Sequence, residues 1–248
     1  MYRVLIVGSG IMGKGISRLL SRQNVEHTLI SGHEFLINPN KYQDVLKESN
    51  LLLECLAEDF DLKTRFLKVC SDHEYSGQIG TCTSSLSITS LQEYAPNAQK
   101  YAGVHFMNPP SLIRVVEIVP GDGTSAETIF QLRQWVDSIG CKIIEVKDVP
   151  GFLINSILFV MLNQAAHVFA TTGLSAEAID EAMKDVCGHK LGPLATLDMI
   201  GVDVAISIIE ELHKRDPETY MPASKVLYTM KSSGDIGRKS GKGFYAYK

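Results

Sequence analysis

Residues 4–13, VLIVGSGIMG, decide the fold of this chain. The apolar residues Val4 to Val7 run straight into the glycine-rich stretch Gly8-Ser9-Gly10-Ile11-Met12-Gly13. A helical pattern of apolar residues then covers Ile11–Arg22. A strand, a glycine-rich turn and a helix in this order are typical of the start of a βαβ unit. The sequence therefore predicts an α/β domain that begins with the first strand of the chain.

The glycine-rich stretch has the spacing GxGxxG, which suggests a dinucleotide site. Gly8 would make the tight turn, Gly10 would let a pyrophosphate approach the backbone, and Gly13 would let the helix pack closely on the strand. Ile11 and Met12 stand at the helix N-terminus, which would face the phosphates. GxGxxG alone is a weak signal, but a plain strand–helix turn needs no third glycine. Its place between a strand and a helix favours a cofactor site at these five residues.

Strand-like and helical segments go on alternating as far as Val146. Strands separated by helices of this length imply parallel βαβ units. We therefore expect a Rossmann-type α/β fold with a mostly parallel sheet in residues 1–149. The expected strands are YRVLIV (2–7), HTLIS (27–31), LLLEC (51–55), QIGTC (78–82), YAGVHF (101–106), RVVEIV (114–119) and KIIEV (142–146), and the expected helices are Ile11–Arg22, Asp61–Ser71 and Ser125–Ile139.

The strand pattern ends at Asp148-Val149-Pro150-Gly151. Helical segments follow, with Ser at an N-cap and Gly or Pro at the boundaries. We therefore expect a smaller all-helical C-terminal domain in residues 150–248. Its expected helices are Phe152–Thr172 ended by Gly173, Ala176–Val186 capped by Ser175, and a run after Gly192-Pro193.

Composition excludes several kinds of function. The 248 residues are 45% hydrophobic and 21% charged, as in an ordinary globular protein. A net charge of −4 offers no basic surface, so we expect no nucleic-acid partner. The five cysteines are odd in number and never spaced as CxxC, which argues against a disulfide framework and a zinc site. We therefore expect no metal.

Two apolar stretches raise the question of a membrane. The N-terminal stretch is broken at Gly8, too early for a signal peptide. We expect the stretch Phe152–Ala170 to lie in a domain core or a dimer core. We also expect that the protein has no membrane partner and is cytoplasmic. Hydrocarbon would penalise four polar side chains of this stretch: Asn155, Asn163, Gln164 and His167.

The second expected strand lacks the acid that a NAD site usually has at its end. About twenty residues after the glycines, such sites place an Asp or Glu on the ribose 2′-hydroxyl. Here Ser31, Gly32 and His33 follow the strand. Without a carboxylate the ribose loses its usual acceptor, and a 2′-phosphate is no longer repelled. No Arg stands next to Ser31 to bind that phosphate, so the choice of NAD or NADP stays open, with a lean to NAD.

Polar residues stand at the ends of later strands: Thr83-Ser84-Ser85, His105 with Asn108, and Glu117. Ligands of open α/β sheets bind outside the carboxyl ends of strands, so we expect His105 in that crevice. Taken alone, His105 is better interpreted as a hydrogen-bonded core residue. Glu117 lies among Val and Ile and needs a partner, because a buried carboxylate alone is costly. A His105–Glu117 pair would suit a general base that acts on an alcohol.

Several stretches of this chain resemble the L-3-hydroxyacyl-CoA dehydrogenase family. The resemblance spans nearly the whole chain, and related enzymes that oxidise other 3-hydroxy acids share the motifs. It implies a NAD-dependent homodimer of fatty acid metabolism that acts on the 3-hydroxyl of an acyl-CoA thioester. The stretches, in order, are GSGIMGKGI (8–16), TSSLSIT (83–89), HFMNPP (105–110) followed by VVEIV (115–119), DVPGFLINSIL (148–158), GPLATLDMIGVD (192–203) and GRKSGKGFYAYK (237–248).

The resemblance also implies roles for single residues. His105 is then the base that takes the 3-hydroxyl proton while hydride leaves C3, and Glu117 orients it. Ser84 hydrogen-bonds the substrate oxygen and contacts the cofactor. Asn155 helps to hold the substrate, although it could instead be a buried asparagine at a helix start.

Four more residues are placed at the cofactor by the resemblance alone. Glu58 and Lys63 match the family's E-x-x-x-x-K stretch, Asn108 its HFxNP asparagine, and Lys239 the lysine of its C-terminal tail. By residue type, Glu58, Lys63 and Lys239 would pass as solvated surface charges. Ser31 is expected at the cofactor's ribose.

The chain departs from the family pattern in several places. Cys82 stands where Asn usually precedes Thr-Ser-Ser, and Ser156 stands where Arg commonly follows the GFxxN asparagine. Between the second and third strands the family has a long, lysine-bearing helical hairpin that helps to bind the CoA nucleotide. Here Gly32–Asn50 has room only for a loop and one short helix around Lys41–Glu48. We expect that the catalytic residues are kept and that the affinity for the CoA nucleotide is reduced.

Three alternatives to an acyl-CoA substrate remain. The acyl group could be carried by an acyl carrier protein, whose thioester has no adenine nucleotide to hold. The substrate could be a free 3-hydroxy acid or sugar acid. A non-enzymatic protein with this fold is the third alternative, but it predicts loss of Ser84, His105, Glu117 or Asn155, and all four are present.

Overall fold

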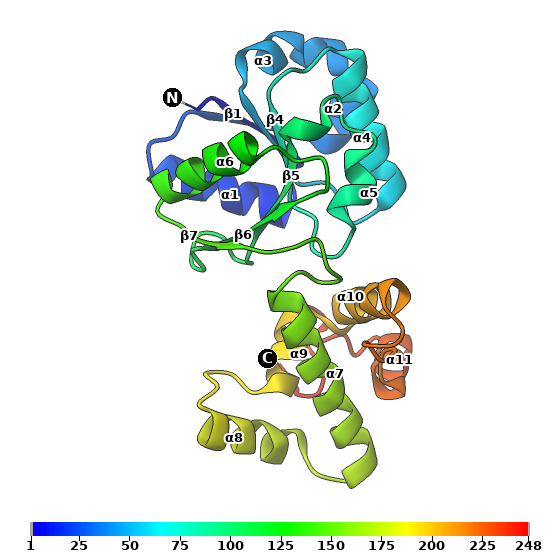
Figure 1. Ribbon diagram of the computed structural model, residues 1–248. Coiled ribbons are helices and arrows are strands. Elements are labelled where there is room, and N and C mark those ends of the chain that lie inside the picture. Colours follow the sequence, from blue (N-terminus) through cyan, green and yellow to red (C-terminus); the bar gives the residue numbers. More distant parts are fainter. Residues whose placement is uncertain (1, 248) are drawn as a thin grey trace. The chain divides into compact units, whose positions relative to one another are not determined.

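The computed structural model describes residues 2–247 and divides the chain into two compact units, Met1–Phe152 and Leu153–Lys248. The first unit is built on a sheet and the second is helical, as expected (Figure 1). The division falls after Phe152, slightly beyond the expected boundary at residues 149 and 150. The reason is that the Phe152 ring packs into the core of the first unit.

The first unit contains a seven-stranded sheet with the order β2-β1-β3-β4-β5-β6-β7. All neighbours run parallel except β5 and β6, which are antiparallel. Each of the seven expected runs forms a strand, so the predicted mostly parallel sheet is confirmed. The strands are β1 (Val4–Val7), β2 (His27–Ile30), β3 (Leu51–Glu54), β4 (Gln78–Thr81), β5 (Tyr101–Phe106), β6 (Val115–Pro120) and β7 (Lys142–Glu145).

Helices cover both faces of this sheet (Figure 1). Strands buried on two faces are nearly uniformly apolar, as β1 illustrates with four buried residues. One face packs against α1 (Ile11–Arg22) and α6 (Ala126–Ser138). The other face packs against α2 (Gly32–Ile37), α3 (Gln43–Glu48), α4 (Phe60–Asp72) and α5 (Ile88–Gln92). Two 3₁₀ turns, η1 (Pro39–Tyr42) and η2 (Ala98–Lys100), complete the unit.

The strand order places a switch point at β1, which lies between β2 and β3. Ligands of open α/β sheets bind beyond the carboxyl ends of the strands at such a point. Because β1 to β5 run parallel, the residues at their carboxyl ends share one edge of the sheet. These residues are Gly8, Ser31, Cys55, Cys82 and, near the end of β5, His105.

The segment between β2 and β3 differs from the expectation of one short helix. It forms two, α2 and α3, joined by η1. The extra helix, α2, begins where the Ser31 hydroxyl accepts a hydrogen bond from the Glu34 N–H at 3.5 Å, and it buries Phe35 completely. It ends before Pro39, because a proline disfavours helical backbone at the preceding residue.

The second unit has a helical core of its own. Its longest helix, α7, buries Asn155, Phe159 and Leu162 on one face and exposes Ile157 and Val160 on the other. Among the described residues, α7 alone has the length and composition of a membrane span, a test that core helices of soluble proteins also pass. The elements are α7 (Ile154–Thr172), α8 (Ala176–Cys187), α9 (Pro193–Ile200), α10 (Val202–Arg215), α11 (Lys225–Ser232) and η3 (Arg238–Ser240).

Candidate active site

The expected His105–Glu117 pair is present across β5 and β6. The two residues are register partners in the antiparallel ladder, so their side chains leave the same face of the sheet. Nδ1 of His105 lies 2.7 Å from Oε2 of Glu117, and both side chains are buried. The Phe152 ring packs edge-on against the imidazole, with 5.6 Å between ring centroids. The imidazole is thus held by Glu117 and Phe152, and Nε2 is its remaining nitrogen.

Glu58 organises the loop that follows β4. Its Oε1 accepts hydrogen bonds from the hydroxyls of Thr83 at 2.7 Å and Ser85 at 2.9 Å. The same oxygen accepts from the backbone N–H groups of Ser84 and Ser85, both at 2.8 Å. Charge-assisted bonds of this kind fix a loop firmly. Glu58 therefore positions Ser84 at the ligand-binding edge, while its contact with the cofactor stays a prediction.

Lys63 is buried, unlike the surface lysine that its residue type suggests. Its Nζ donates to both carboxylate oxygens of Glu54, at 2.7 and 2.8 Å, and lies 3.8 Å from Oε2 of Glu58. Burial alone would lower the pKa of Lys63, but Glu54 and Glu58 raise it above its ordinary value. Lys63 therefore keeps its charge and links Glu54 to Glu58. Its predicted contact with the cofactor is untested.

Sequence reasoning missed Glu54. It is 1% exposed, and besides Lys63 it accepts hydrogen bonds from Thr81 Oγ1 and the Leu56 N–H, both at 2.6 Å. The signal was available, because a carboxylate within the apolar run LLLEC needs a buried partner just as Glu117 does.

Cys82, at the position where the family usually has Asn, pairs with another thiol. Its Sγ lies 3.4 Å from Sγ of Cys55, and both side chains are buried at the ends of neighbouring strands. The hydrogen bond with Cys55 and burial raise the pKa of Cys82 well above its ordinary value. Cys82 is therefore expected to remain a thiol that packs as a small apolar side chain.

The backbone of the glycine loop leaves room for a ligand at one glycine only. Gly8 has φ of +121°, and a Cβ there would lie 2.3 Å from the carbonyl oxygen of Cys55. A Cβ on Gly13 would lie 1.8 Å from the carbonyl oxygen of Gly8, because the helix starts so close to the turn. A Cβ on Gly10 would meet nothing within 4 Å. Open space over Gly10 is what a pyrophosphate needs, so these residues fit a dinucleotide.

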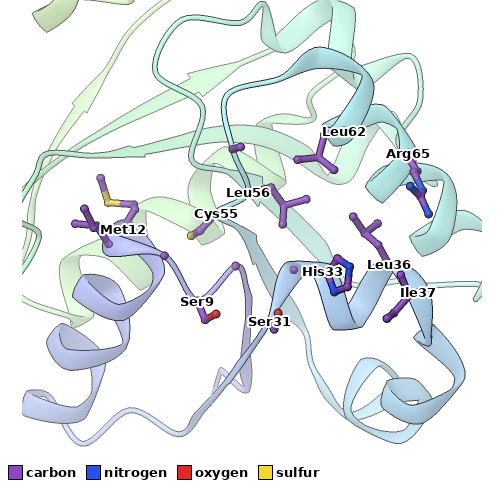
Figure 2. A pocket seen from close by; sticks show the side chains of 15 residues that line it. Ser9, Met12, Ser31, His33, Leu36, Ile37, Cys55, Leu56, Leu62 and Arg65 are labelled. Atoms are coloured by element: carbon purple, nitrogen blue, oxygen red, sulfur yellow. The ribbon is translucent and has the colours of Figure 1, made fainter. Parts of the chain in front are cut away.

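A cavity of about 730 Å³ opens beside this loop (Figure 2). Its volume lies in the range of small-molecule and cofactor sites. It joins the loop after β1 to the ends of β2 and β3 and to helices α2 and α4. The lining comprises Gly8, Ser9, Gly10, Ile11, Met12, Ser31, Gly32, His33, Leu36, Ile37, Cys55, Leu56, Ala57, Leu62 and Arg65. Five of the predicted cofactor residues, Gly8, Gly10, Ile11, Met12 and Ser31, are among them.

Three other predicted residues are not among the lining residues of this cavity. Asn108 is exposed after the end of β5, in the first unit. Asn155 is buried in the first turn of α7, and Lys239 lies on η3, where its Nζ is 2.7 Å from Oδ2 of Asp203. Asn155 and Lys239 belong to the second unit, and their roles toward substrate and cofactor stay predictions.

The C-terminal tail is tied to the second unit by Asp198, a residue that sequence reasoning did not single out. Its carboxylate accepts hydrogen bonds from the N–H groups of Phe244 and Tyr245 and from the Tyr247 hydroxyl, each at 2.9 Å. A Cβ on Gly243 would lie 2.0 Å from the same carboxylate, which explains a glycine there. Two of the quoted motifs, residues 192–203 and 237–248, are therefore partners in one hydrogen-bonded unit.

Comparisons with known proteins agree with this site. The NAD-binding domain of 3-hydroxyacyl-CoA dehydrogenase matches residues 34–149, and the C-terminal domain of the same family matches residues 151–247. A probable 3-hydroxybutyryl-CoA dehydrogenase of Bacillus subtilis is 34% identical over 220 residues, covering 86% of this chain and 76% of that protein. The chain belongs to the 3-hydroxyacyl-CoA dehydrogenase family.

Other members of the 3-hydroxyacyl-CoA dehydrogenase family match as well. The 3-hydroxybutyryl-CoA dehydrogenase of Clostridioides difficile is 36% identical over 210 residues, which is 83% of this chain and 73% of that protein. The crystal structure of (S)-3-hydroxybutyryl-CoA dehydrogenase from Ralstonia eutropha has a TM-score of 0.89 and 32% identity, covering 100% and 99% of the two chains. The predicted family, the enzyme class of oxidoreductase and NAD as cofactor are thus confirmed.

One comparison bears on the length of this chain. The match to pig mitochondrial hydroxyacyl-coenzyme A dehydrogenase, 28% identical, runs over 286 aligned positions, whereas this chain has 248 residues. At least 38 aligned positions therefore have no residue here.

Proposed function

We propose that the chain interconverts a short 3-hydroxyacyl-CoA thioester and its 3-oxoacyl-CoA thioester, with NAD as the hydride carrier. The observation that carries this proposal is the 2.7 Å contact between His105 Nδ1 and Glu117 Oε2 at the ligand-binding edge of the sheet. The relatives named above, which are 3-hydroxybutyryl-CoA dehydrogenases, support a short acyl chain.

The arrangement of His105 explains the proton transfer. The imidazole donates its Nδ1 proton to the Glu117 carboxylate, so Nε2 carries the lone pair that accepts the proton of the substrate 3-hydroxyl. Glu117 then stabilises the imidazolium that forms. NAD, when bound, would supply the acceptor for the hydride that leaves the substrate carbon. In the reverse direction, His105 returns the proton to the substrate oxygen.

Ser84 supplies the second polar contact to the substrate oxygen in this proposal. Its backbone is fixed because Glu58 accepts the Ser84 N–H, and Glu58 in turn lies against Lys63. Lys63 and Glu58 therefore act as positioning residues for Ser84. A loop held in place before the substrate arrives lowers the cost of aligning the reacting groups.

A second carrier for the acyl group, an acyl carrier protein, is favoured by the segment Gly32–Asn50. One of its two lysines, Lys41, is poorly placed for nucleotide binding, since it already pairs with Glu34 and lies 5.3 Å from the Tyr42 ring centre. Lys47 is exposed and is the second of the two. A carrier-protein thioester presents no adenine nucleotide and does not need such cations.

An assay that follows reduced nicotinamide by absorbance tests both candidates. The substrates are acetoacetyl-CoA, acetoacetyl carrier protein and free acetoacetate, each with NADH. Reduction of the CoA thioester supports the main proposal, and a much higher kcat/KM with the carrier protein supports the second. Reduction of free acetoacetate alone would mean that the enzyme acts on free 3-hydroxy acids, and turnover of none of the three would remove both candidates.

The chain is further proposed to act as a homodimer in the cytoplasm, without membrane contact. Only 22% of the most apolar window of α7 is buried within the chain, and Ile157 and Val160 are 64% and 47% exposed. A symmetric partner would cover such a face. Sedimentation should give the dimer mass at micromolar concentration, and a single monomeric species would contradict the dimer. Recovery of the protein in the membrane fraction of lysed cells would contradict the proposed location.

A further inference from the structure

We propose that the ribose end of the cofactor cavity also binds a 2′-phosphate, through Arg65 and His33, so that the enzyme accepts NADP(H) as well as NAD(H). NAD-specific sites exclude that phosphate with a carboxylate directly after the second strand. Here Ser31 takes this position. Its hydroxyl accepts the Glu34 N–H at 3.5 Å and keeps its own proton to donate to a phosphate oxygen.

The described lining of the cavity contains an arginine and a histidine and no carboxylate. Arg65 from α4 and His33 from α2 both line it, and none of the described lining residues is an Asp or Glu. Figure 2 shows His33 between Ser31 and Leu36, with Arg65 beyond Leu36 at the same end of the cavity. The sequence places no arginine next to Ser31, but the fold supplies one from a helix that begins after the third strand. A guanidinium offers a planar set of donors that matches phosphate geometry.

The nearest carboxylate in the sequence, Glu34, does not act at this end of the cavity. Helix α2 contributes Gly32, His33, Leu36 and Ile37 to the lining but not Glu34. The Glu34 carboxylate forms an ion pair with Lys41, and hydrogen bonds from Lys41 and Tyr42 lower its pKa. Its charge is therefore balanced outside the cavity.

Arg65 is available for a ligand. It is exposed, and among the described residues its guanidinium forms no ion pair. Leu62, one turn earlier on α4, also lines the cavity, so the same face of the helix carries both residues. An arginine on the cavity face of α4 and a histidine on the cavity face of α2 would hold a phosphate between the two helices. The apolar residues Leu36, Ile37 and Leu56 would contact the adenine.

Binding of adenine nucleotides tests the proposal without any acyl substrate. Isothermal titration calorimetry would compare adenosine 2′,5′-bisphosphate with 5′-AMP, which differ only in the 2′-phosphate. We expect the bisphosphate to bind at least about tenfold more tightly, about 1.4 kcal/mol. A smaller preference, or tighter binding of 5′-AMP, would overturn the proposal. This outcome is independent of the acyl substrate, so it is separate from a failure of the proposed function.

Three variants assign the effect to the named residues. Arg65→Gln should lower the bisphosphate-to-AMP affinity ratio about tenfold or more, and Ser31→Asp should reverse the preference by placing a carboxylate at the ribose. The matched control is Lys68→Gln, an exposed cation on α4 outside the cavity lining, which should leave the ratio unchanged. An equal fall in Lys68→Gln would mean that general positive charge, not Arg65, attracts the phosphate, and the assignment would be wrong.

A second readout uses catalysis and rests on the proposed function. The ratio of kcat/KM for NADPH to that for NADH, with acetoacetyl-CoA, should follow the binding ratio through the same variants. NADH turnover without NADPH turnover would contradict the inference and leave the proposed function intact.

Discussion

The Lys63 ammonium donates hydrogen bonds to both carboxylate oxygens of Glu54, and no more than 2% of either side chain is exposed. Glu54 ends β3 and Lys63 lies on α4, so the pair joins the sheet to a helix beside the ligand-binding edge. Through the 3.8 Å contact with Glu58, the same lysine supports the loop that holds Ser84. The Lys63–Glu54 pair therefore helps to fix the geometry of the loop at the ligand-binding edge.

Removing the charge of Lys63 should destabilise the first unit strongly. Lys63→Met leaves Glu54 buried without a counter-charge, which costs about 3–5 kcal/mol. Fluorescence of Trp135, the single Trp of the chain, reports unfolding of this unit in denaturant. Lys68→Met, an exposed lysine on the same helix, is the control and should change stability by less than about 0.5 kcal/mol.

If Lys63→Met does not fold, a double variant still tests the prediction. Adding Glu54→Gln to Lys63→Met removes the orphaned charge and should recover part of the lost stability, as the pair is coupled. Additive losses in the double variant would contradict the proposed coupling.

His105→Gln should lower kcat by roughly 10²–10⁴ with little change in the affinity for NADH, because only proton transfer is lost. Steady-state kinetics and a separate NADH titration measure the two effects. Glu117→Gln should lower kcat less, since the imidazole remains but loses its charged partner. If the His105 variant kept half of the wild-type rate, His105 would have no part in the mechanism.

The nucleotide half of CoA should contribute little to catalysis. We expect acetoacetyl-pantetheine to be reduced with kcat/KM within roughly tenfold of acetoacetyl-CoA, about 1.4 kcal/mol. The reason is that a remote group of the substrate contributes binding energy to catalysis only where the protein contacts it. Gly32–Asn50 offers few free cations to contact the nucleotide phosphates. A CoA thioester superior by several orders of magnitude to both pantetheine and carrier-protein thioesters would contradict the reduced grip.

Asp198→Asn should destabilise the second unit. The carboxylate accepts three hydrogen bonds from the tail, two from N–H groups and one from the Tyr247 hydroxyl. An amide offers one acceptor oxygen, so half-buried donors lose partners at a cost of about 1–3 kcal/mol. Circular dichroism in denaturant measures the loss, and Asp185→Asn, an exposed carboxylate on α8, should have no comparable effect.

The ion pair of Asp203 and Lys239 should give a small, pH-dependent contribution to stability. Burial alone would raise the pKa of Asp203, but the hydrogen bond from Lys239 and that from the Val204 backbone lower it below 3.8. A depressed carboxyl pKa stabilises the fold above the unfolded-state value and ceases to do so as the pH falls through the folded-state value.

Lys239→Met should therefore cost less than about 1 kcal/mol at neutral pH, because both side chains are partly exposed and screened. The difference from wild type should shrink as the pH falls below 3.8. Denaturant unfolding at several pH values measures this trend. A constant difference across the acid range would mean that Lys239 stabilises the fold by packing and not by its charge.

Much of the fold could be predicted because it depends on local patterns. The strand runs and the GxGxxG turn follow from apolar periodicity and from backbone space at Gly8 and Gly13. The His105–Glu117 pair was predictable because each residue lies in an otherwise apolar strand and needs a partner. The short helices α2 and α5 were missed, since five or six residues carry too little periodicity to recognise.

The sequence by itself determined the family, the order of the elements and the pairing of His105 with Glu117, because these depend on residue types at short spacings. Only the tertiary structure decided which partners the charged residues outside these motifs have. Lys63 is buried on Glu54, Asp198 holds the tail, and Arg65 joins His33 in the cofactor cavity. These contacts bring together residues from different elements. These contacts form when the helices pack on the sheet and on one another. They cannot be predicted from local sequence patterns.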